Sequence, residues 1–347
     1  LAVGGQLREE RTFFFADYQG TRQALARVVT STVPLPAQRS GDFSATLGAR
    51  LFLDPKTLTA TTIDTGTPIE VLDTTGRLIQ AQVGQIFRPG DRRAYAGNLI
   101  PANDLDPVAR RLIDRYPLPT SAGSANNFTR TANEQLWQEQ SDLRLDHRIS
   151  RFGRLFGRLS IALEAAEPVT PLPEGSGAIT QGILGRQRSG GYQVVASHQQ
   201  TIGERMINEL RGGVTRRKID RRSVSASSQF QLPGLPSSGS FGDVMPTMAI
   251  TGIQQLGPSP NTNTRFSTEV AQLVEMLSLQ RQRHSIKLGL DARLERLTIR
   301  QPPSPRGLFS FTAPDAGSRG APNTTGSLST GSLLAGLTGN ALASFLL

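Results

Sequence analysis

Strict alternation of apolar and polar residues constrains the fold of this chain more than any other feature. Within Ser141 to Ser150, one set of alternate positions holds apolar residues and a histidine, and the other holds charged residues. The first set is Leu143, Leu145, His147 and Ile149, and the second is Asp142, Arg144, Asp146 and Arg148. Successive side chains of a β-strand point to opposite faces, so this pattern predicts a strand with one apolar face. A tight connection at 150–153 leads to a partner strand whose apolar face holds Leu155, Leu159, Ile161 and Leu163.

The same hairpin pattern recurs twice. Gly191 to Gln199 turns at 201–204 into Met206 to Thr215, and Phe266 to Leu279 turns at 280–283 into Ser285 to Leu297. The incoming strand of the last pair is mixed. One of its faces holds Val270, Val274 and Met276 with Gln272, and the other holds Leu273, Leu277 and Leu279 with Glu269 and Glu275.

The connections between strands alternate between short and long. The segments at about 165–189 and 217–264 are rich in Pro, Gly, Ser and Gln, and they are longer than loops of compact soluble domains usually are. A soluble β-sandwich has short connections at both ends. Short turns at one end and long loops at the other are typical of outer-membrane barrels. The predicted fold class is therefore all-β, a partial antiparallel transmembrane β-barrel with long extracellular loops.

Composition agrees with a barrel but raises one alternative. No apolar run approaches the roughly 20 residues of a membrane-spanning helix. The net charge of +10 would suit a nucleic-acid-binding protein. Nearly all of it is arginine interleaved with other residues, and only Arg216 to Arg222 is a dense cluster. We interpret that cluster as a solvated or lipopolysaccharide-facing loop. The aromatic fraction of 6% argues against the barrel, whose interfaces usually carry aromatic girdles.

The N-terminal third contains few strand signals. Arg11 to Gly20 is predicted as an aromatic strand, and residues 20–136 as one long extracellular loop region. Within it, Asp106 and Pro107 are typical of a helix start, which predicts a short amphipathic helix at 106–116. This helix is expected to pack on its own loop, the alternative being that it binds a partner. Short β-like runs in Asp54 to Gln85 indicate a small hairpin subdomain.

Several phrases of the chain resemble one family. They are Arg-Thr-Phe-Phe-Phe-Ala-Asp-Tyr-Gln-Gly (Arg11 to Gly20), Val33 to Ser44, Gly97 to Ala109, Tyr-Pro-Leu-Pro (Tyr116 to Pro119), Leu143 to Ser150 and Arg283 to Asp291. In order and spacing they resemble the Oar-like TonB-dependent outer-membrane receptors, which carry a carboxypeptidase-regulatory-like domain. The resemblance spans the whole chain.

The resemblance implies a place in the cell and a function. Residues 1–347 would be the N-terminal part of a roughly 22-stranded barrel, a fragment without the plug domain and the remaining strands. Such a fragment is expected to form a curved, incomplete sheet. The implied protein lies in the outer membrane and takes up or exports an unidentified small molecule, peptide or glycan. Its implied partners are outer-membrane lipid or lipopolysaccharide and, through the missing N-terminal region, the TonB complex.

Two charged rows are the candidate site, and they are predicted to face the barrel lumen because an Arg facing lipid costs about 2 to 4 kcal/mol. The rows could recognise a polar ligand, or they could be structural, with charges paired across neighbouring strands. The residues of the two rows are Asp142, Arg144, Asp146 and Arg148, and Lys287, Asp291, Arg293 and Glu295.

The sequence does not favour an enzyme. Its histidines, His147, His198 and His284, lie on or beside predicted strands and turns, and no nucleophile elbow is present. Cysteine is absent, and Asp54, Asp64 and Asp73 lack calcium-loop spacing. We therefore expect no catalytic residue, no cofactor and no metal site, and no nucleic-acid partner. A barrel-anchored structural or adhesive surface protein stays open as the alternative to a transporter, with a soluble basic β protein as a third.

Overall fold

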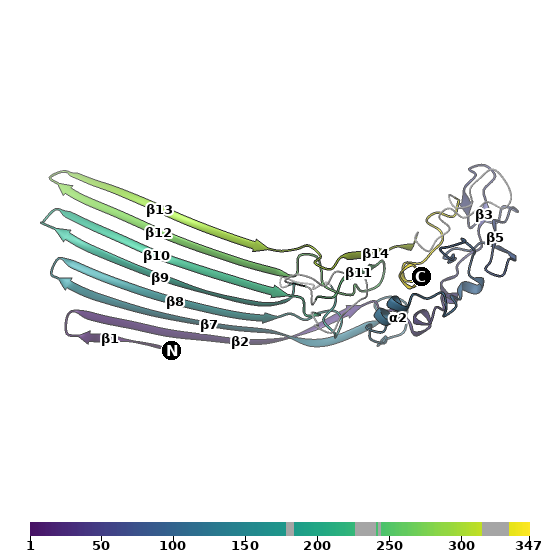
Figure 1. Ribbon diagram of the computed structural model, residues 1–347, viewed down its shortest axis with the longest axis horizontal. Helices are drawn as coiled ribbons and strands as arrows, with labels where there is room; N and C mark the ends of the chain where they lie inside the picture. The colour runs from purple at the N-terminus through teal and green to yellow at the C-terminus, as the bar shows by residue number, and fades with distance from the viewer. Residues whose placement is uncertain (178–183, 226–240, 242–243, 314–332) are drawn as a thin grey trace.

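Eight long antiparallel strands form one open sheet in this computed structural model, which describes residues 1–177, 184–225, 241, 244–313 and 333–347. Each strand is hydrogen-bonded to the strand before it in the sheet, with β1 and β13 at the two edges (Figure 1). The predicted partial antiparallel barrel is confirmed as a fold class. In sheet order the strands are β1 (Ala2–Arg8), β2 (Thr12–Ser31), β7 (Phe128–Ser150), β8 (Gly153–Glu167), β9 (Arg186–Ile202), β10 (Met206–Arg222), β12 (Thr264–Arg281) and β13 (His284–Arg300).

Short turns join the strands at one end of the sheet, and long loops join them at the other (Figure 1). Positive φ angles at Glu10, Gly203 and Gln282 mark three of the short turns, where a tight reversal needs the left-handed region. The asymmetry predicted from the sequence is therefore present. In outer-membrane barrels, short turns face the periplasm and long loops face outward.

The strands are longer than the sequence suggested, and β1 was not predicted at all. The proposed loop at 20–136 is wrong at both ends, since Thr21 pairs with Gln138 and Ser31 pairs with Phe128. The loop itself comprises only residues 32–127. Arg216 to Arg222 likewise belongs to β10 and not to a loop. Backbone pairing continues beyond the apolar part of each strand, where no hydrophobic alternation reveals it.

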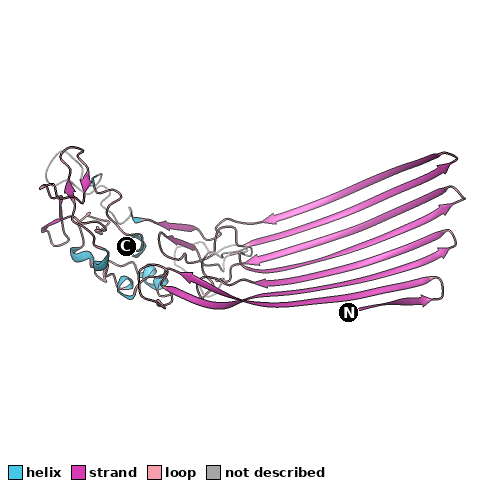
Figure 2. Ribbon diagram, turned by 180° about the vertical axis from the view of Figure 1, so that it is seen from behind, coloured by secondary structure: helices cyan, strands magenta, loops and turns pink. Residues whose placement is uncertain are grey.

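The described residues of the long loops fold into a second region, which we call the cap: 32–127, 168–177, 184–185, 223–225, 241, 244–263, 301–313 and 333–347. All helices of the described residues lie there (Figure 2), and none is long and apolar enough to cross a membrane. The predicted hairpin subdomain near 54–85 is present as two small β-hairpins. The cap elements are α1 (Pro36–Arg39), η1 (Ser44–Thr46), β3 (Phe52–Leu53), β4 (Ala60–Thr61), β5 (Glu70–Leu72), β6 (Leu78–Gln80), η2 (Ala96–Asn98), α2 (Pro107–Ile113), β11 (Thr247–Ile250), β14 (Leu308–Phe311) and α4 (Ala341–Leu346).

Helix α2 shows how the cap is assembled. The Asp106 carboxylate accepts hydrogen bonds from the backbone N–H groups of Val108 and Ala109, both at 2.8 Å, so it caps the helix as the sequence predicts. The buried face of α2 joins a core shared with β11 and α4, which come from other long loops. The helix packs on residues of its own loop and also on segments of other long loops, and it ends at Ile113 rather than at residue 116.

Candidate functional site

The strand register divides the sheet into an apolar face and a polar face. Residues directly opposite each other on neighbouring antiparallel strands share a face. One such row runs from β7 to β13 through apolar residues only: Leu143, Leu159, Val194, Val214, Ala271 and Leu294. The next row lies on the other face and is mainly polar: Asp142, Ser160, Gln193, Thr215, Val270 and Glu295.

The apolar face is uncovered. Its side chains include Leu290, which is 62% exposed, and Leu294, which is 73% exposed. On β13 every second residue from Ile286 to Leu294 is apolar, a length of roughly 26 Å at about 3.3 Å per residue. That length is close to the roughly 25 Å apolar band of outer-membrane barrels. We call the equivalent stretch on all strands the apolar band, and its exposure is what a lipid-facing surface requires.

The register also resolves the mixed strand β12. Leu273 and Leu277 lie on the apolar face, opposite Gly212 and Asn208, while Val270 and Val274 lie on the polar face. Glu275 therefore stands within the apolar band, between Leu210 and Leu290. Its carboxylate accepts a short hydrogen bond from the Asn208 amide.

The two candidate charged rows share the polar face but do not meet. One row is on β7 and the other is on β13, with four strands between them. In a closed barrel this face lines the interior. All the residues of the two rows lie on one face of the sheet, but they do not form one compact site. The members are Asp142, Arg144, Asp146 and Arg148, and Lys287, Asp291, Arg293 and Glu295.

Most ion pairs of these rows run along a strand and not across strands. Arg144 Nε lies 2.7 Å from Asp146 Oδ2, and Arg293 Nη2 lies 3.2 Å from Glu295 Oε2. The exception is Asp142, only 8% exposed, whose carboxylate lies 2.6 Å from Arg158 Nη2 on β8. Its neighbours, Ser160 and Gln140, donate further hydrogen bonds to it. Asp142 is the member of the rows that the structure holds most firmly.

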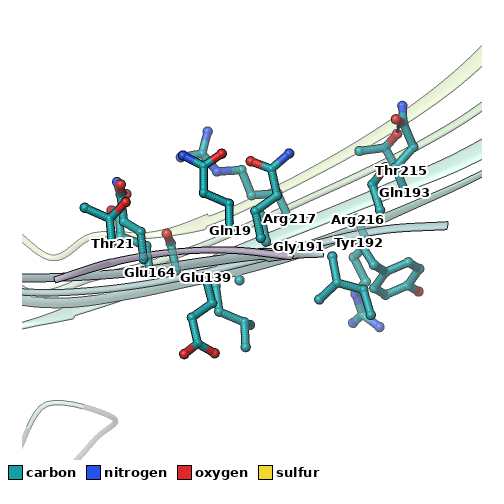
Figure 3. Close-up of a pocket in the computed structure, with 18 residues that line it drawn as sticks. Gln19, Thr21, Glu139, Glu164, Gly191, Tyr192, Gln193, Thr215, Arg216 and Arg217 are labelled. Atoms are coloured by element: carbon teal, nitrogen blue, oxygen red, sulfur yellow. Dashed lines mark hydrogen bonds between the residues drawn. The ribbon is translucent and has the colours of Figure 1, made fainter. Parts of the chain in front are cut away.

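The polar face contains a glutamine-lined hollow of about 460 Å³ that the sequence pattern did not predict. Its floor is open because Ala162 and Gly191 stand opposite each other in the register. Figure 3 shows Gln19, Thr21, Gln193 and Thr215 on one side of the sheet, with Glu139 and Tyr192 on the other. The sequence pattern that could have predicted this hollow is the presence of glutamines at alternate positions of the strands. Its polar-face amides are Gln19, Gln138, Gln140 and Gln193.

A second hollow of about 480 Å³ lies on the same face, nearer to the short turns. It contains three of the candidate residues, Arg144, Asp146 and Arg148, together with Phe13 and Phe156. The Arg144 guanidinium stacks 4.9 Å from the centre of the Phe156 ring, a cation–π contact. Both hollows offer hydrogen bonds and charge, which suits the binding of polar groups.

Three of the six family-like phrases lie in the cap, namely Val33 to Ser44, Gly97 to Ala109 and Tyr116 to Pro119, and the other three lie in the sheet and its short turns. The cap phrases contain buried residues. Asn98 is fully buried, and its Oδ1 accepts hydrogen bonds from Gln85 Nε2 at 2.8 Å and from the Ile86 N–H at 2.9 Å. Gly41, with φ of 90°, has the Ile100 carbonyl oxygen 2.6 Å from where a Cβ would stand. These phrases therefore have a packing role in the cap.

Comparison with known proteins agrees with this architecture. A family model described as an outer membrane beta barrel domain matches residues 1–347. No curated protein and no solved structure matches the chain. The matched family and the uncovered apolar band both place the protein in the outer membrane. This chain belongs to the outer membrane beta barrel domain family.

Proposed function

We propose that this chain is part of an Oar-like TonB-dependent receptor that moves a polar ligand across the outer membrane. The observation that carries the proposal is the polar face, where amides and charges line two hollows along the prospective interior of the barrel. The family-like phrases described above support the TonB-dependent assignment.

The ligand is proposed to be a small molecule, peptide or glycan rich in hydrogen-bonding groups. Around the first hollow, the Gln193 amide donates to Thr215 Oγ1 at 3.1 Å, and the Gln138 amide donates to Glu164 Oε2 at 2.9 Å. Gln19 has no such partner within the described part of the chain. Neutral amides that both donate and accept match ligands of mixed polarity better than a single fixed charge does.

The proposed role is not enzymatic and does not involve nucleic acid. His147 and His198 lie on the apolar face, and His147 Nδ1 is 2.9 Å from Thr12 Oγ1. His198 lies outside both hollows, and His147 borders the second hollow with its Nδ1 at hydrogen-bond distance from Thr12 Oγ1. The basic residues are distributed over both faces of the sheet, unlike the single basic groove of a nucleic-acid-binding protein.

A barrel-anchored adhesive protein is the second candidate, and the cap favours it. A cap with its own buried core is a stable surface that could contact other cells or matrix. The two functions differ in their need for energy coupling through TonB. A receptor requires a plug and a TonB-contacting segment in the complete reading frame, whereas an anchor does not.

Binding of the purified periplasmic domain of TonB to the full-length protein tests the proposal. We expect a one-to-one complex that is lost when the TonB-contacting segment is deleted. A control deletion of equal length elsewhere in the upstream region should leave the complex intact. Absence of a plug from the reading frame, or absence of any complex, would contradict transport and favour the adhesive candidate.

A further inference from the structure

A group of cations stands on the apolar face of the sheet, immediately beyond the apolar band on the side of the cap. Val214, Ala271 and Leu294 form the last apolar row. The next row on the same face is Arg216, Glu269 and Arg296, and the row after that is Lys218, Ser267 and Thr298. We define the basic patch as Arg188, Arg216, Lys218 and Arg296.

Strand parity separates this patch from the rest of the arginine cluster in β10. Arg217 and Arg221 point to the polar face, where the Arg221 guanidinium donates to the Thr262 carbonyl at 3.0 Å. Arg216 and Lys218 point to the lipid side. One run of basic sequence therefore supplies two different surfaces.

Most of the positive charge of the basic patch is uncompensated. Arg216 Nε lies 2.9 Å from Glu269 Oε1, so this arginine is paired. Arg188, Lys218 and Arg296 are exposed, and none has an ion pair or hydrogen bond within the described residues. Their charges are available to an external anion.

The free cations are close enough to act together. Lys218 is opposite Gly190, two residues from Arg188 on the neighbouring strand. The row of Lys218 continues through Ser267 on β12 to Thr298 on β13. Arg296 lies two residues before Thr298 on the same strand. Neighbouring strands are about 4.8 Å apart, so Lys218 and Arg296 stand on strands roughly 10 Å apart with hydroxyl groups between them. Long basic side chains can span this distance around a phosphate group.

We propose that the basic patch binds the phosphate groups of lipopolysaccharide, the glycolipid of the outer leaflet. The apolar band directly below the patch would contact the acyl chains of the same molecule, and the cap side of the band is the outer side. Basic residues at a membrane surface attract anionic headgroups. A soluble anion would use the cations alone, whereas lipopolysaccharide uses the cations and the band together.

Binding of lipopolysaccharide by the basic patch does not depend on the proposed transport function. It rests on the outer surface of the barrel and needs neither the polar hollows nor the TonB complex. A receptor and an adhesive protein would both retain the patch. A negative result for lipopolysaccharide binding would therefore leave the proposed transport untouched, and a failure of the transport proposal would leave the patch untouched.

Native mass spectrometry of the full-length protein in detergent, with added lipopolysaccharide, tests the patch. The variant R188Q/K218Q/R296Q should weaken binding at least about tenfold. The matched control R217Q removes one arginine from the same strand but from the opposite face, and its binding should equal that of the wild type. Enzymatically dephosphorylated lipopolysaccharide should bind the wild type as weakly as intact lipopolysaccharide binds the triple variant.

The outcomes separate the possible ligands. Equal binding of intact and dephosphorylated lipopolysaccharide to the wild type overturns the proposal even if the triple variant fails to fold. Inorganic phosphate that competes at equal concentration would indicate a general anion site and also overturns it. A loss of binding free energy in R217Q of about one third of the loss in the triple variant, in proportion to the charge removed, would show that total charge and not the patch governs binding, and it would overturn the proposal.

Discussion

The sheet and the cap of this protein bury their apolar residues in opposite ways. Every large side chain that is less than 2% exposed in the described residues lies in the cap, including Phe43, Ile113 and Met245. The sheet instead exposes large apolar side chains such as Leu288 and Leu294 along one face. The cap is built for water, which drives its core together, and the sheet is built for lipid, which covers its apolar face. Two solvents therefore select two patterns in one chain.

Truncation of a cap core residue should have the largest effect. Leu112 is 2% exposed, so Leu112→Ala should lower the free energy of unfolding of the cap by about 2 to 5 kcal/mol. Limited proteolysis of the membrane-inserted protein should then cleave the cap faster while the sheet stays protected. Leu118→Ala is the control, because Leu118 is 64% exposed. Equal acceleration by both variants would contradict the assignment of the core.

A charge in the apolar band should affect the sheet and leave the cap intact. Leu290→Arg is expected to destabilise the inserted barrel by about 2 to 4 kcal/mol. Asp291→Arg places the same side chain one residue away on the polar face, where its cost should be below about 1 kcal/mol. Urea unfolding of the full-length protein in lipid vesicles, followed by heat-modifiable mobility, measures both. Similar costs at the two positions would mean that the faces are wrongly assigned.

Removal of the one carboxylate described within the apolar band should stabilise the sheet. Glu275→Leu completes the apolar surface between Leu210 and Leu290, so its unfolding midpoint in urea should rise. Glu269→Leu is the matched control, since Glu269 lies beyond the band and pairs with Arg216. The control should show no gain. A lower midpoint for Glu275→Leu would contradict this expectation and would mean that loss of the hydrogen bond from Asn208 costs more than removal of the carboxylate gains.

The smallest expected effect is a pH dependence of the stability of the cap. Burial raises the pKa of the Glu174 carboxyl, although the Ser176 N–H, 3.2 Å from its Oε1, opposes this. A raised pKa means that the folded cap binds the proton more tightly than the unfolded chain does. Cap stability should therefore be greatest below about pH 4 and fall as pH rises through the raised pKa. The rate of proteolysis of the cap should therefore rise with pH in the wild type, and this dependence should be lost in Glu174→Gln. A wild-type rate that decreases with rising pH would contradict the prediction.

The sheet was predictable where its apolar face meets lipid and not beyond. Leu143 to Ile149 and Leu155 to Leu163 alternate because one face must be apolar, and those strands were found. The halves of β2 and β7 nearer the cap extend beyond the apolar band, so alternation is not required there. Residues 21–31 were assigned to a loop for this reason. The register of β12 also needed its neighbours, because Glu275 interrupts the apolar face.

The cap and the hollows were less predictable because they depend on contacts between distant segments. The Asp106 cap of α2 is a local signal and was recognised, whereas the packing of α2 against α4 joins segments far apart in the sequence. The candidate charged rows share one face of the sheet because strand parity alone decides it. The glutamine hollow arises where Gly191 of β9 meets Ala162 of β8, a coincidence of register that no single strand reveals.

The parallel pairing of β11 with β14 has a mechanical consequence. β11 lies in the loop between β10 and β12, and β14 follows β13, so their ladder ties two loops of the chain together. The Gln254 N–H also donates to the Thr32 carbonyl at 2.8 Å, which connects the loop after β2 to the same tie. A force applied to any one of these loops is therefore transmitted to strands on both sides of the sheet. A ligand that moves the cap must move it as a unit or shear the ladder.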